Sequence, residues 1–246
     1  MIIKTTTIIS NNIIFRIFMS LSKLEKFEAI HHMPHVFENN SFHNPVLISC
    51  GKEVATSGKW HSDIFKNTNP IVFELACGKG EYTVELARRN PNINYIGVDI
   101  KGNRIYSGAQ MAQDEGLKNV CFVRTGIDQL HHFFAKDEIS EVWITFPDPF
   151  PSFSDRRNRL VSPKFLDYYK AHFATKKIIY HLKTDNMRLF RYGVGVLDGK
   201  GEKIHVCLED IYASNKKIED YLKIQTYYEK LHQGMGSHIH YVKWEM

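Results

Sequence analysis

Cysteine is scarce in this 246-residue sequence, and its four copies lie far apart. No C-x-x-C pair of the kind that binds zinc is present, and the wide spacing does not resemble a disulfide framework. The thirteen histidines also lack a standard zinc spacing. No run of 18 or more apolar residues occurs, so no membrane-spanning helix is predicted. These absences argue against a zinc protein, a disulfide-stabilised secreted protein and a helical membrane protein, and they favour a cytoplasmic location.

Extremes of composition are also absent, because apolar residues make up 43% and charged residues 24% of the chain. Both values are typical of soluble globular proteins, and the length suits one α/β domain with short additions. Lysine and arginine total 32 residues against 27 for aspartate and glutamate. This small excess of positive charge favours a polyanionic partner such as nucleic acid, although only weakly.

The N-terminal region divides into two parts by composition. Residues 1–18 differ in composition from the residues after them, and a helix start comes soon afterwards, with Ser22 followed three residues later by Glu25. Side chains at this spacing bond reciprocally to the free backbone amides at the start of a helix. We therefore expect residues 1–18 to be an extension or a misassigned start, residues 19–65 to be an N-terminal appendage, and residues 66–246 to be the main domain.

Short β-branched runs alternate with helical stretches from Ile71 onward. This alternation is typical of βαβ units, in which helices cover both faces of a parallel sheet. Four helices are expected over residues 81–89, 103–115, 163–174 and 187–197, the third with Ser162 as its cap and Pro163 at its first position. Seven strands are expected over residues 71–75, 95–100, 120–124, 141–146, 178–183, 204–208 and 239–244.

A glycine-containing loop follows the first of these strands. Gly78 and Gly80 lie where the strand turns into the next helix, and such glycines let the backbone approach a nucleoside or an amino-acid tail. Glu74 precedes the loop, and Asp99 ends the following strand, about twenty residues after Gly80. An acidic residue at this distance accepts hydrogen bonds from the ribose hydroxyls of an adenosine. The loop therefore predicts an adenosine-containing cofactor.

Acidic side chains decide between the two cofactors that fit this layout. A dinucleotide-binding loop has a third glycine, where this sequence has Thr83, and it holds a pyrophosphate that Glu74 and Glu81 would repel. The same carboxylates attract the ammonium and sulfonium groups of S-adenosylmethionine. We therefore expect S-adenosylmethionine as the cofactor and S-adenosylhomocysteine as its product, with a nicotinamide-dependent dehydrogenase as the weaker alternative.

A proline-rich segment follows the fourth predicted strand. Pro147, Pro149 and Pro151 surround Asp148 and restrict the backbone, so its carboxylate is expected to be fixed at the carboxyl edge of the sheet. Residues 155–159, Asp-Arg-Arg-Asn-Arg, come directly after this segment and offer cations for phosphate contacts. The sequence thus predicts a rigid carboxylate next to a phosphate-binding loop.

Five motifs together resemble one enzyme family. Phe-Pro-Asp-Pro-Phe at 146–150, with Arg-Arg-Asn-Arg-Leu at 156–160, is similar to the signature of bacterial tRNA (guanine-N7)-methyltransferases. The order and spacing of five motifs are more specific than any one of them. The other four are the loop Glu-Leu-Ala-Cys-Gly-Lys-Gly at 74–80, Asp99, Lys-Thr-Asp-Asn at 183–186 and Thr-Tyr-Tyr-Glu at 226–229.

The cofactor side of the sequence departs from the family pattern at two positions. Ala76 replaces a glycine, which a small residue can do if its φ angle is negative. Gly126 stands where many members of the family have an acid that contacts the adenine. The backbone of Thr125 and Gly126, or the side chain of Asp128, is expected to hold the adenine instead.

The substrate side departs at two further positions. Phe150 replaces a tryptophan, and Ser152 stands where a substrate-binding lysine is common. The nucleotide contact of that lysine is expected to pass to Arg156 or Arg157.

The resemblance implies a Rossmann-like class I methyltransferase with a seven-stranded, mostly parallel sheet, which methylates N7 of the variable-loop guanine at position 46 of tRNA. Guanine N7 has a lone pair and no proton, so no general base is needed, and Asp148 is expected to stabilise the charge that develops on the guanine. A monomer and a homodimer both fit, and no metal or membrane is implied. The residues expected to bind the cofactor are Glu74, Ala76, Gly78, Gly80, Asp99, Thr125, Gly126 and Asp148. Those expected to bind tRNA are Ser152, Arg156, Arg157, Asp185, Thr226, Tyr227, Tyr228 and Glu229.

Two other functions stay open beside this one. Pro-Asp-Pro-Phe at 147–150 loosely resembles the D-P-P-[YF] motif of methyltransferases that act on the amino groups of nucleic-acid bases. The departures at Gly126 and Ser152 also fit a catalytically silent RNA-binding homologue. The identity of the methylated nucleoside separates these alternatives.

Overall fold

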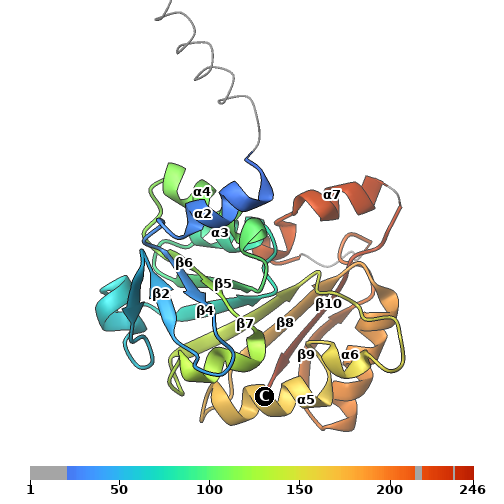
Figure 1. Ribbon diagram of the computed structural model, residues 1–246. Coiled ribbons are helices and arrows are strands. Elements are labelled where there is room, and N and C mark those ends of the chain that lie inside the picture. The colour runs from blue at the N-terminus through green and yellow to red at the C-terminus, as the bar shows by residue number, and fades with distance from the viewer. Residues whose placement is uncertain (1–20, 214–217, 235) are drawn as a thin grey trace, which may run out of the picture.

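A mostly parallel sheet with helices on both faces forms the centre of the computed structural model, which describes residues 21–213, 218–234 and 236–246 (Figure 1). The expectation for residues 1–18 lies outside these ranges. The seven predicted strands are confirmed, with their ends shifted by at most two residues. They are β4 (Ile71–Leu75), β5 (Asn94–Asp99), β6 (Val120–Arg124), β7 (Ile139–Thr145), β8 (Ile179–Thr184), β9 (Lys203–Leu208) and β10 (His240–Glu245).

The sheet nevertheless has ten strands in the described residues, so the predicted number of seven is wrong. The three additional strands are β1 (Val36–Asn39), β2 (Leu47–Ser49) and β3 (Lys52–Val54). Each has only three or four residues, too few for an alternating pattern to be recognised. β1 pairs in parallel with β6, a contact between segments far apart in the chain. Cys50 and Gly51 turn the β2–β3 hairpin with φ angles of 48° and 75°, as a two-residue turn of this kind requires.

Strand order places the loops that carry the motifs next to one another. The order across the sheet is β3-β2-β1-β6-β5-β4-β7-β8-β10-β9. The six neighbouring strands β1, β6, β5, β4, β7 and β8 run parallel to one another. The carboxyl ends of β5, β4, β7 and β8 therefore lie side by side at one edge. In open parallel sheets this edge is where ligands bind.

Two layers of helices bury the two faces of the sheet. On one side α2 (Lys23–Ile30), α3 (Glu81–Arg89) and α4 (Gly102–Asp114) pack on strand residues such as Val72 and Phe122. On the other, α5 (Pro163–His172), α6 (Met187–Gly199) and the π-helix at Trp60–Phe65 pack on Phe73 and its neighbours. Figure 1 shows α2, α3 and α4 above the sheet and α5 and α6 below it, with α7 (Tyr227–Gly234) at the upper right. The remaining helical turns are 3-10 turns at Ile127–His132, Arg156–Asn158 and Asp220–Lys223.

Two predicted helix starts have different outcomes. The Ser22–Glu25 capping box is confirmed, because the Ser22 amide donates to the Glu25 carboxylate at 2.8 Å and the Glu25 amide donates to the Ser22 hydroxyl at 3.3 Å. Pro163 begins α5 as predicted, but Ser162 makes no cap bond. Its buried hydroxyl donates to the Arg157 carbonyl at 3.0 Å instead, which secures the loop before the helix.

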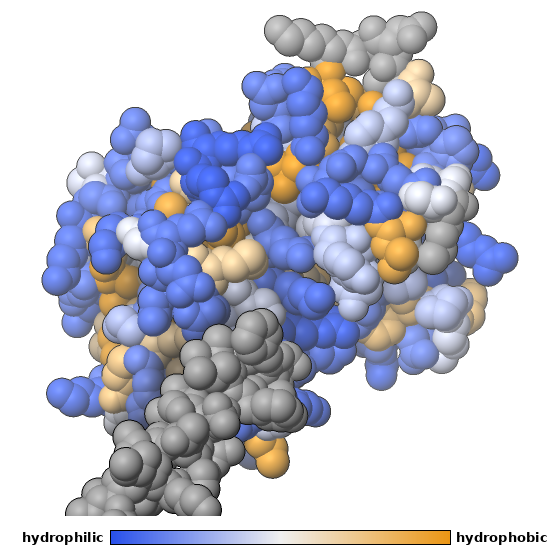
Figure 2. Space-filling model, turned by 90° about the horizontal axis from the view of Figure 1, so that it is seen from above, coloured by the Kyte–Doolittle hydropathy of each residue, from blue (hydrophilic) through white to orange (hydrophobic). Residues whose placement is uncertain are grey.

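Length and hydropathy decide whether a helix in the described part of the chain can span a membrane. None of the helices there is both long enough and apolar enough to cross a bilayer. Hydrophilic side chains cover most of the face in Figure 2, and the hydrophobic patches between them are small.

Candidate active site

A continuous cleft lies at the carboxyl edge of the sheet. One part, of about 240 Å³, is lined by Asp99, Thr125, Gly126 and Asp148 among others. The adjoining part, of about 100 Å³, is lined by residues that include Glu74, Gly78, Thr226 and Tyr228. Both parts share the side chains of Ala76, Arg104 and Phe146, so they form one cleft. Residues from four of the five motifs thus meet in one place.

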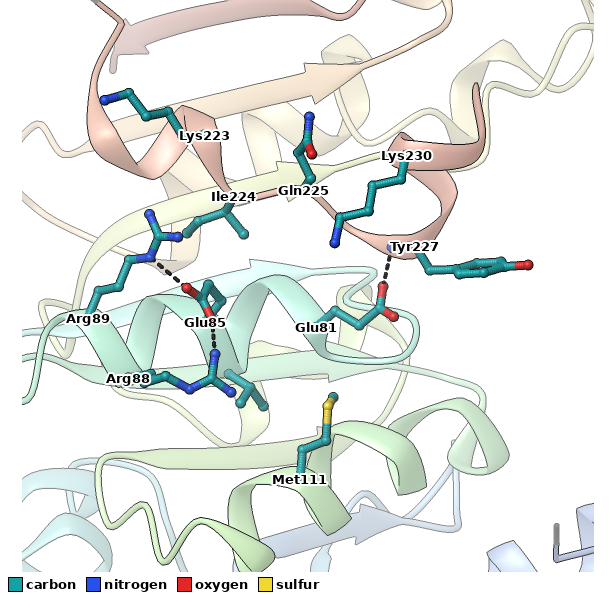
Figure 3. A pocket seen from close by; sticks show the side chains of 11 residues that line it. Glu81, Glu85, Arg88, Arg89, Met111, Lys223, Ile224, Gln225, Tyr227 and Lys230 are labelled. Atoms are coloured by element: carbon teal, nitrogen blue, oxygen red, sulfur yellow. Dashed lines mark hydrogen bonds and ion pairs between the residues drawn. The ribbon is translucent and has the colours of Figure 1, made fainter. Parts of the chain in front are cut away.

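A larger cavity of about 520 Å³ lies beside α3, between this helix and residues 223–230 (Figure 3). Of the predicted site residues it contains only Tyr227. The arginines that line it already have partners, since Arg88 and Arg89 both pair with Glu85. We therefore place the candidate active site in the cleft at the sheet edge.

Asp99 fixes the cofactor loop to the end of β5. Its carboxylate accepts one hydrogen bond from the Gly78 amide at 2.9 Å and one from the Lys101 amide at 2.8 Å. The side chain is nearly buried yet lines the cleft. Because a carboxylate has two lone-pair sites on each oxygen, both oxygens keep acceptor capacity for a ligand hydroxyl.

Glu74 is buried beneath the loop and bonded to two threonines. Its two oxygens accept the hydroxyls of Thr83 and Thr145. Burial raises the pKa of Glu74 to about 7, and the two hydroxyl bonds only partly oppose this shift. Thr83, which stands where a dinucleotide fingerprint has its third glycine, thus anchors the carboxylate. Gly97 leaves the room for it, since a Cβ there would lie 2.9 Å from the Thr83 hydroxyl.

The three small residues of the cofactor loop all have left-handed backbones. The φ angles are 58° for Ala76, 57° for Gly78 and 69° for Gly80. Ala76 was expected to replace glycine freely if its φ angle were negative, and this angle is positive. The alanine is therefore strained by about 1–2 kcal/mol. A Cβ on Gly78 would meet nothing within 4 Å, so this glycine leaves the cleft open. A Cβ on Gly80 would lie 2.6 Å from the Phe122 ring, so this glycine serves helix–strand packing.

The segment around Asp148 has a residue with a positive φ angle at each end. Phe146 and Phe150 have φ angles of 47° and 42°, and the two residues enclose Pro147, Asp148 and Pro149. The Phe146 amide donates to a backbone carbonyl of β8 at 2.8 Å. The side chain of Asp148 is exposed and lines the cleft. Strained residues of this kind occur where the surrounding structure fixes a functional group.

Arg159 differs from the other arginines of the predicted phosphate-binding cluster. Its buried guanidinium donates to the Pro149 carbonyl at 2.9 Å and to the Phe150 carbonyl at 2.8 Å, and it stacks on the Tyr192 ring. The cluster prediction is therefore wrong for this residue, because its donors are used to close the loop around Asp148. Sequence alone could not separate three arginines within four positions.

The other members of the cluster, and Ser152 before them, lie at the surface. Arg156, Arg157 and Ser152 all have exposed side chains. The Arg156 guanidinium lies 3.3 Å from the centre of the Phe153 ring, and Ser152 shares a hydrogen bond of 2.7 Å with Ser154. Both arginines are accessible to a polyanion.

Asp128 occupies the space that opens at Gly126. A Cβ on Gly126 would lie 2.7 Å from the Asp128 Oδ1 atom, so the carboxylate stands where a side chain at position 126 would begin. Thr125 is buried, and its hydroxyl accepts a hydrogen bond of 3.2 Å from Asn39 at the end of β1. The strand missed in the sequence thus supports the floor of the cleft.

The last two motifs meet through a buried ion pair that the sequence analysis missed. Lys183 lies within β8, and its ammonium is 2.8 Å from the Glu229 carboxylate with both side chains fully buried. Glu229, expected to bind tRNA, faces the interior, whereas Thr226 and Tyr228 line the cleft. A lysine inside a predicted central strand was the available signal, because buried lysines need a partner.

Other predicted residues lie near this pair. Asp185 is half-buried after β8, and Asn186 caps α6 by accepting from the Leu189 amide at 2.9 Å. The Tyr227 amide donates to the Glu81 carboxylate at 2.9 Å, which ties the C-terminal segment to the cofactor loop. Among the residues that the structure describes, no group of His, Cys, Asp or Glu is arranged to hold a metal ion.

Comparisons with known proteins show which family the chain resembles. The model of a family described as "Putative methyltransferase" matches residues 68–242. The tRNA (guanine-N(7)-)-methyltransferase of Christiangramia forsetii is 43% identical over 215 residues, which cover 85% of this chain and 95% of that protein. The protein of the same name from Bacteroides fragilis is 42% identical over 225 residues, covering 92% and 86%. Among solved structures, the 16S rRNA methyltransferase KamB has a TM-score of 0.58 at 13% identity, covers 79% of this chain and 96% of its own, and shares the fold alone.

Proposed function

The chain belongs to the tRNA (guanine-N(7)-)-methyltransferase family, and on that premise we propose that it methylates N7 of the variable-loop guanine, at position 46, of tRNA. The observation that carries the proposal is the single cleft shared by Asp99, Asp148 and Thr226 at the edge of the sheet. The extent of the match to the relatives supports the same reaction, because the chain spans 95% of one of them.

S-adenosylmethionine supplies the methyl group, and the residues of the cleft fit this cofactor. Asp99 retains acceptor capacity for ribose hydroxyls, and the space above Gly78 is open to an approaching ligand. Glu74 offers a carboxylate at the base of the loop, and it attracts the cationic end of the cofactor when it ionises. Thr125 and Gly126 line the cleft with Asp128 beside Gly126, and we assign this group to the adenine.

The work of the protein lies mainly in alignment. Guanine N7 needs no deprotonation, so catalysis consists of holding its lone pair in line with the methyl group, an effect of up to about 7–11 kcal/mol in well-oriented systems. We assign Asp148 to the guanine, where its carboxylate can accept hydrogen bonds from N1–H and the amino group and stabilise the developing positive charge. Arg159 and the two strained phenylalanines fix the backbone that carries this carboxylate.

The remaining predicted residues are assigned to tRNA. Arg156 and Arg157 would contact phosphates, and Ser152 lies beside them on the same exposed loop. Thr226 and Tyr228 line the cleft and would contact the target nucleotide. Asp185, just after β8, and the exposed Tyr227 are assigned to the same nucleotide. Glu229 would act indirectly, since its contact with Lys183 fixes the turn that presents Thr226 and Tyr228.

Transfer of labelled methyl groups to unmodified tRNA transcripts tests this function. We expect 7-methylguanosine to form in a transcript with guanine at position 46 and not in a matched transcript with adenine there. Label in an adenine or cytosine amino group would assign the chain to the amino-group class. Cofactor binding without transfer to any tRNA would identify a silent RNA-binding homologue.

A further inference from the structure

Arg104 lines the cleft but has no role in the reaction proposed above. Arg104 is the third residue of α4, its side chain is exposed, and it lines both parts of the cleft. Within residues 21–213, 218–234 and 236–246, its guanidinium makes no ion pair or hydrogen bond. By contrast, Arg88, Arg89 and Arg124 pair with carboxylates, and Arg159 donates to two carbonyls.

Strand order places Arg104 on the opposite wall from the basic loop at Arg156 and Arg157. Arg104 follows β5, whereas Arg156 and Arg157 follow β7, and β4 lies between these two strands. Lys101, also exposed, lies on the same wall as Arg104 and lines the larger part of the cleft. Arg156 and Arg157 do not line the cleft themselves, but Asn158 and Leu160 of the same loop do, so cations flank the cleft on both sides.

A nucleic-acid strand needs cations on both walls because the floor of the cleft is acidic. The cleft contains the carboxyl groups of Glu74, Asp99 and Asp148, which repel phosphates. A target nucleotide whose base reaches Asp148 carries phosphates on both of its sides. Cations from one loop alone would leave one of these phosphates facing carboxylates without compensation.

We propose that Arg104, assisted by Lys101, holds a phosphate of the tRNA strand on the wall of the cleft opposite Arg156 and Arg157. This inference rests on the proposed function. The planar guanidinium matches two phosphate oxygens. Arg104 lies where the two parts of the cleft join, so it would meet a tRNA strand that crosses the mouth of the cleft. The carboxylate of the cofactor is the other oxyanion that could reach this side chain, and binding measurements separate the two.

The test compares Arg104→Gln with wild-type protein in two assays. In filter binding from about 50 to 200 mM salt, we expect Arg104→Gln to weaken tRNA binding about tenfold and to lower the log–log salt slope by about one. In calorimetry, the affinity for S-adenosylmethionine should stay within about twofold. Lys177→Gln is the matched control, because it removes one exposed charge just before β8, at the opposite edge of the sheet, and should leave the slope unchanged.

Three outcomes would overturn the inference. An unchanged tRNA affinity and slope in Arg104→Gln would remove the phosphate contact, while wild-type methylation of tRNA would leave the proposed function intact. A loss of cofactor affinity with unchanged tRNA binding would assign Arg104 to the cofactor carboxylate. Wild-type protein that neither binds nor methylates tRNA would overturn the proposed function and this inference together.

Discussion

Lys183 and Glu229 form an ion pair of 2.8 Å between strand β8 and helix α7, and neither side chain is exposed. The Lys183 ammonium also donates to the Leu222 and Ile224 carbonyls, at 3.1 and 2.7 Å, and Glu229 accepts from the Tyr212 hydroxyl at 2.7 Å. Burial lowers the pKa of Lys183, and the contact with Glu229 opposes this shift. One ammonium thus holds residues 222–229 against the sheet.

Removal of one partner should destabilise the protein more than replacement of both. We expect Lys183→Met to lower the free energy of unfolding by about 3–5 kcal/mol, because Glu229 is left buried without its cation. The double variant Lys183→Met/Glu229→Gln should recover most of this loss. Chemical denaturation measures the free energy of unfolding of each variant. A loss in the double variant that equals the sum of the losses in Lys183→Met and Glu229→Gln would contradict the pairing.

The titration of Glu74 should make cofactor binding depend on pH. Burial raises its pKa to about 7 in the free protein, so the carboxyl group is mostly protonated below that pH. A bound cation favours the ionised form, so binding below pH 7 must release a proton, and affinity should rise with pH and level off above about 7. Calorimetry in buffers of different ionisation enthalpy detects the released proton. A profile that is the same in Glu74→Gln would show that another group titrates.

The strained backbone at Ala76 should make this position sensitive to side-chain size. Its φ of 58° is permitted for glycine and disfavoured for larger residues. We expect Ala76→Gly to keep stability within about 1 kcal/mol of wild type, since relief of strain offsets the greater entropy of the unfolded chain. Ala76→Val should lose at least about 2 kcal/mol and weaken cofactor binding. Equal thermal stability of the two variants would contradict the left-handed conformation.

The guanidinium of Arg159 should control turnover through the position of Asp148. Lysine cannot donate to the Pro149 and Phe150 carbonyls at once, so Arg159→Lys should lower kcat about a hundredfold with little change in cofactor Kd. Arg157→Lys is the matched control, because its charge is exposed and it should change KM for tRNA more than kcat. If Arg159→Lys raised KM alone, the residue would belong to the phosphate-binding surface.

The central sheet was predictable from sequence because its strands are buried and its signals are local. Ile71–Leu75 and Val120–Arg124 are apolar runs with loop signals at their ends, and the structure reproduces both boundaries. β1, β2 and β3 were not predictable, since Val36–Asn39 gains its partner from a distant strand. Local pattern carries no information about such pairing.

The residues of the candidate site also fall into those that local sequence predicts and those that depend on distant partners. The motifs placed Asp99 and Asp148 at the sheet edge, because the position of a residue at a strand end follows from the strand itself. The roles of Arg159 and Glu229 depended on three-dimensional partners. Sequence spacing gives the type of side chain at a position but not whether it faces solvent or the interior, and both residues face the interior.

The turnover of Asp148→Ala tests the account most directly, because this variant removes the carboxylate assigned to the guanine. With unmodified tRNA and saturating cofactor, we expect single-turnover methylation to fall at least about a hundredfold, while calorimetry finds the cofactor Kd unchanged within about twofold. Methylation at a near-normal rate would contradict the assignment of Asp148 to the guanine.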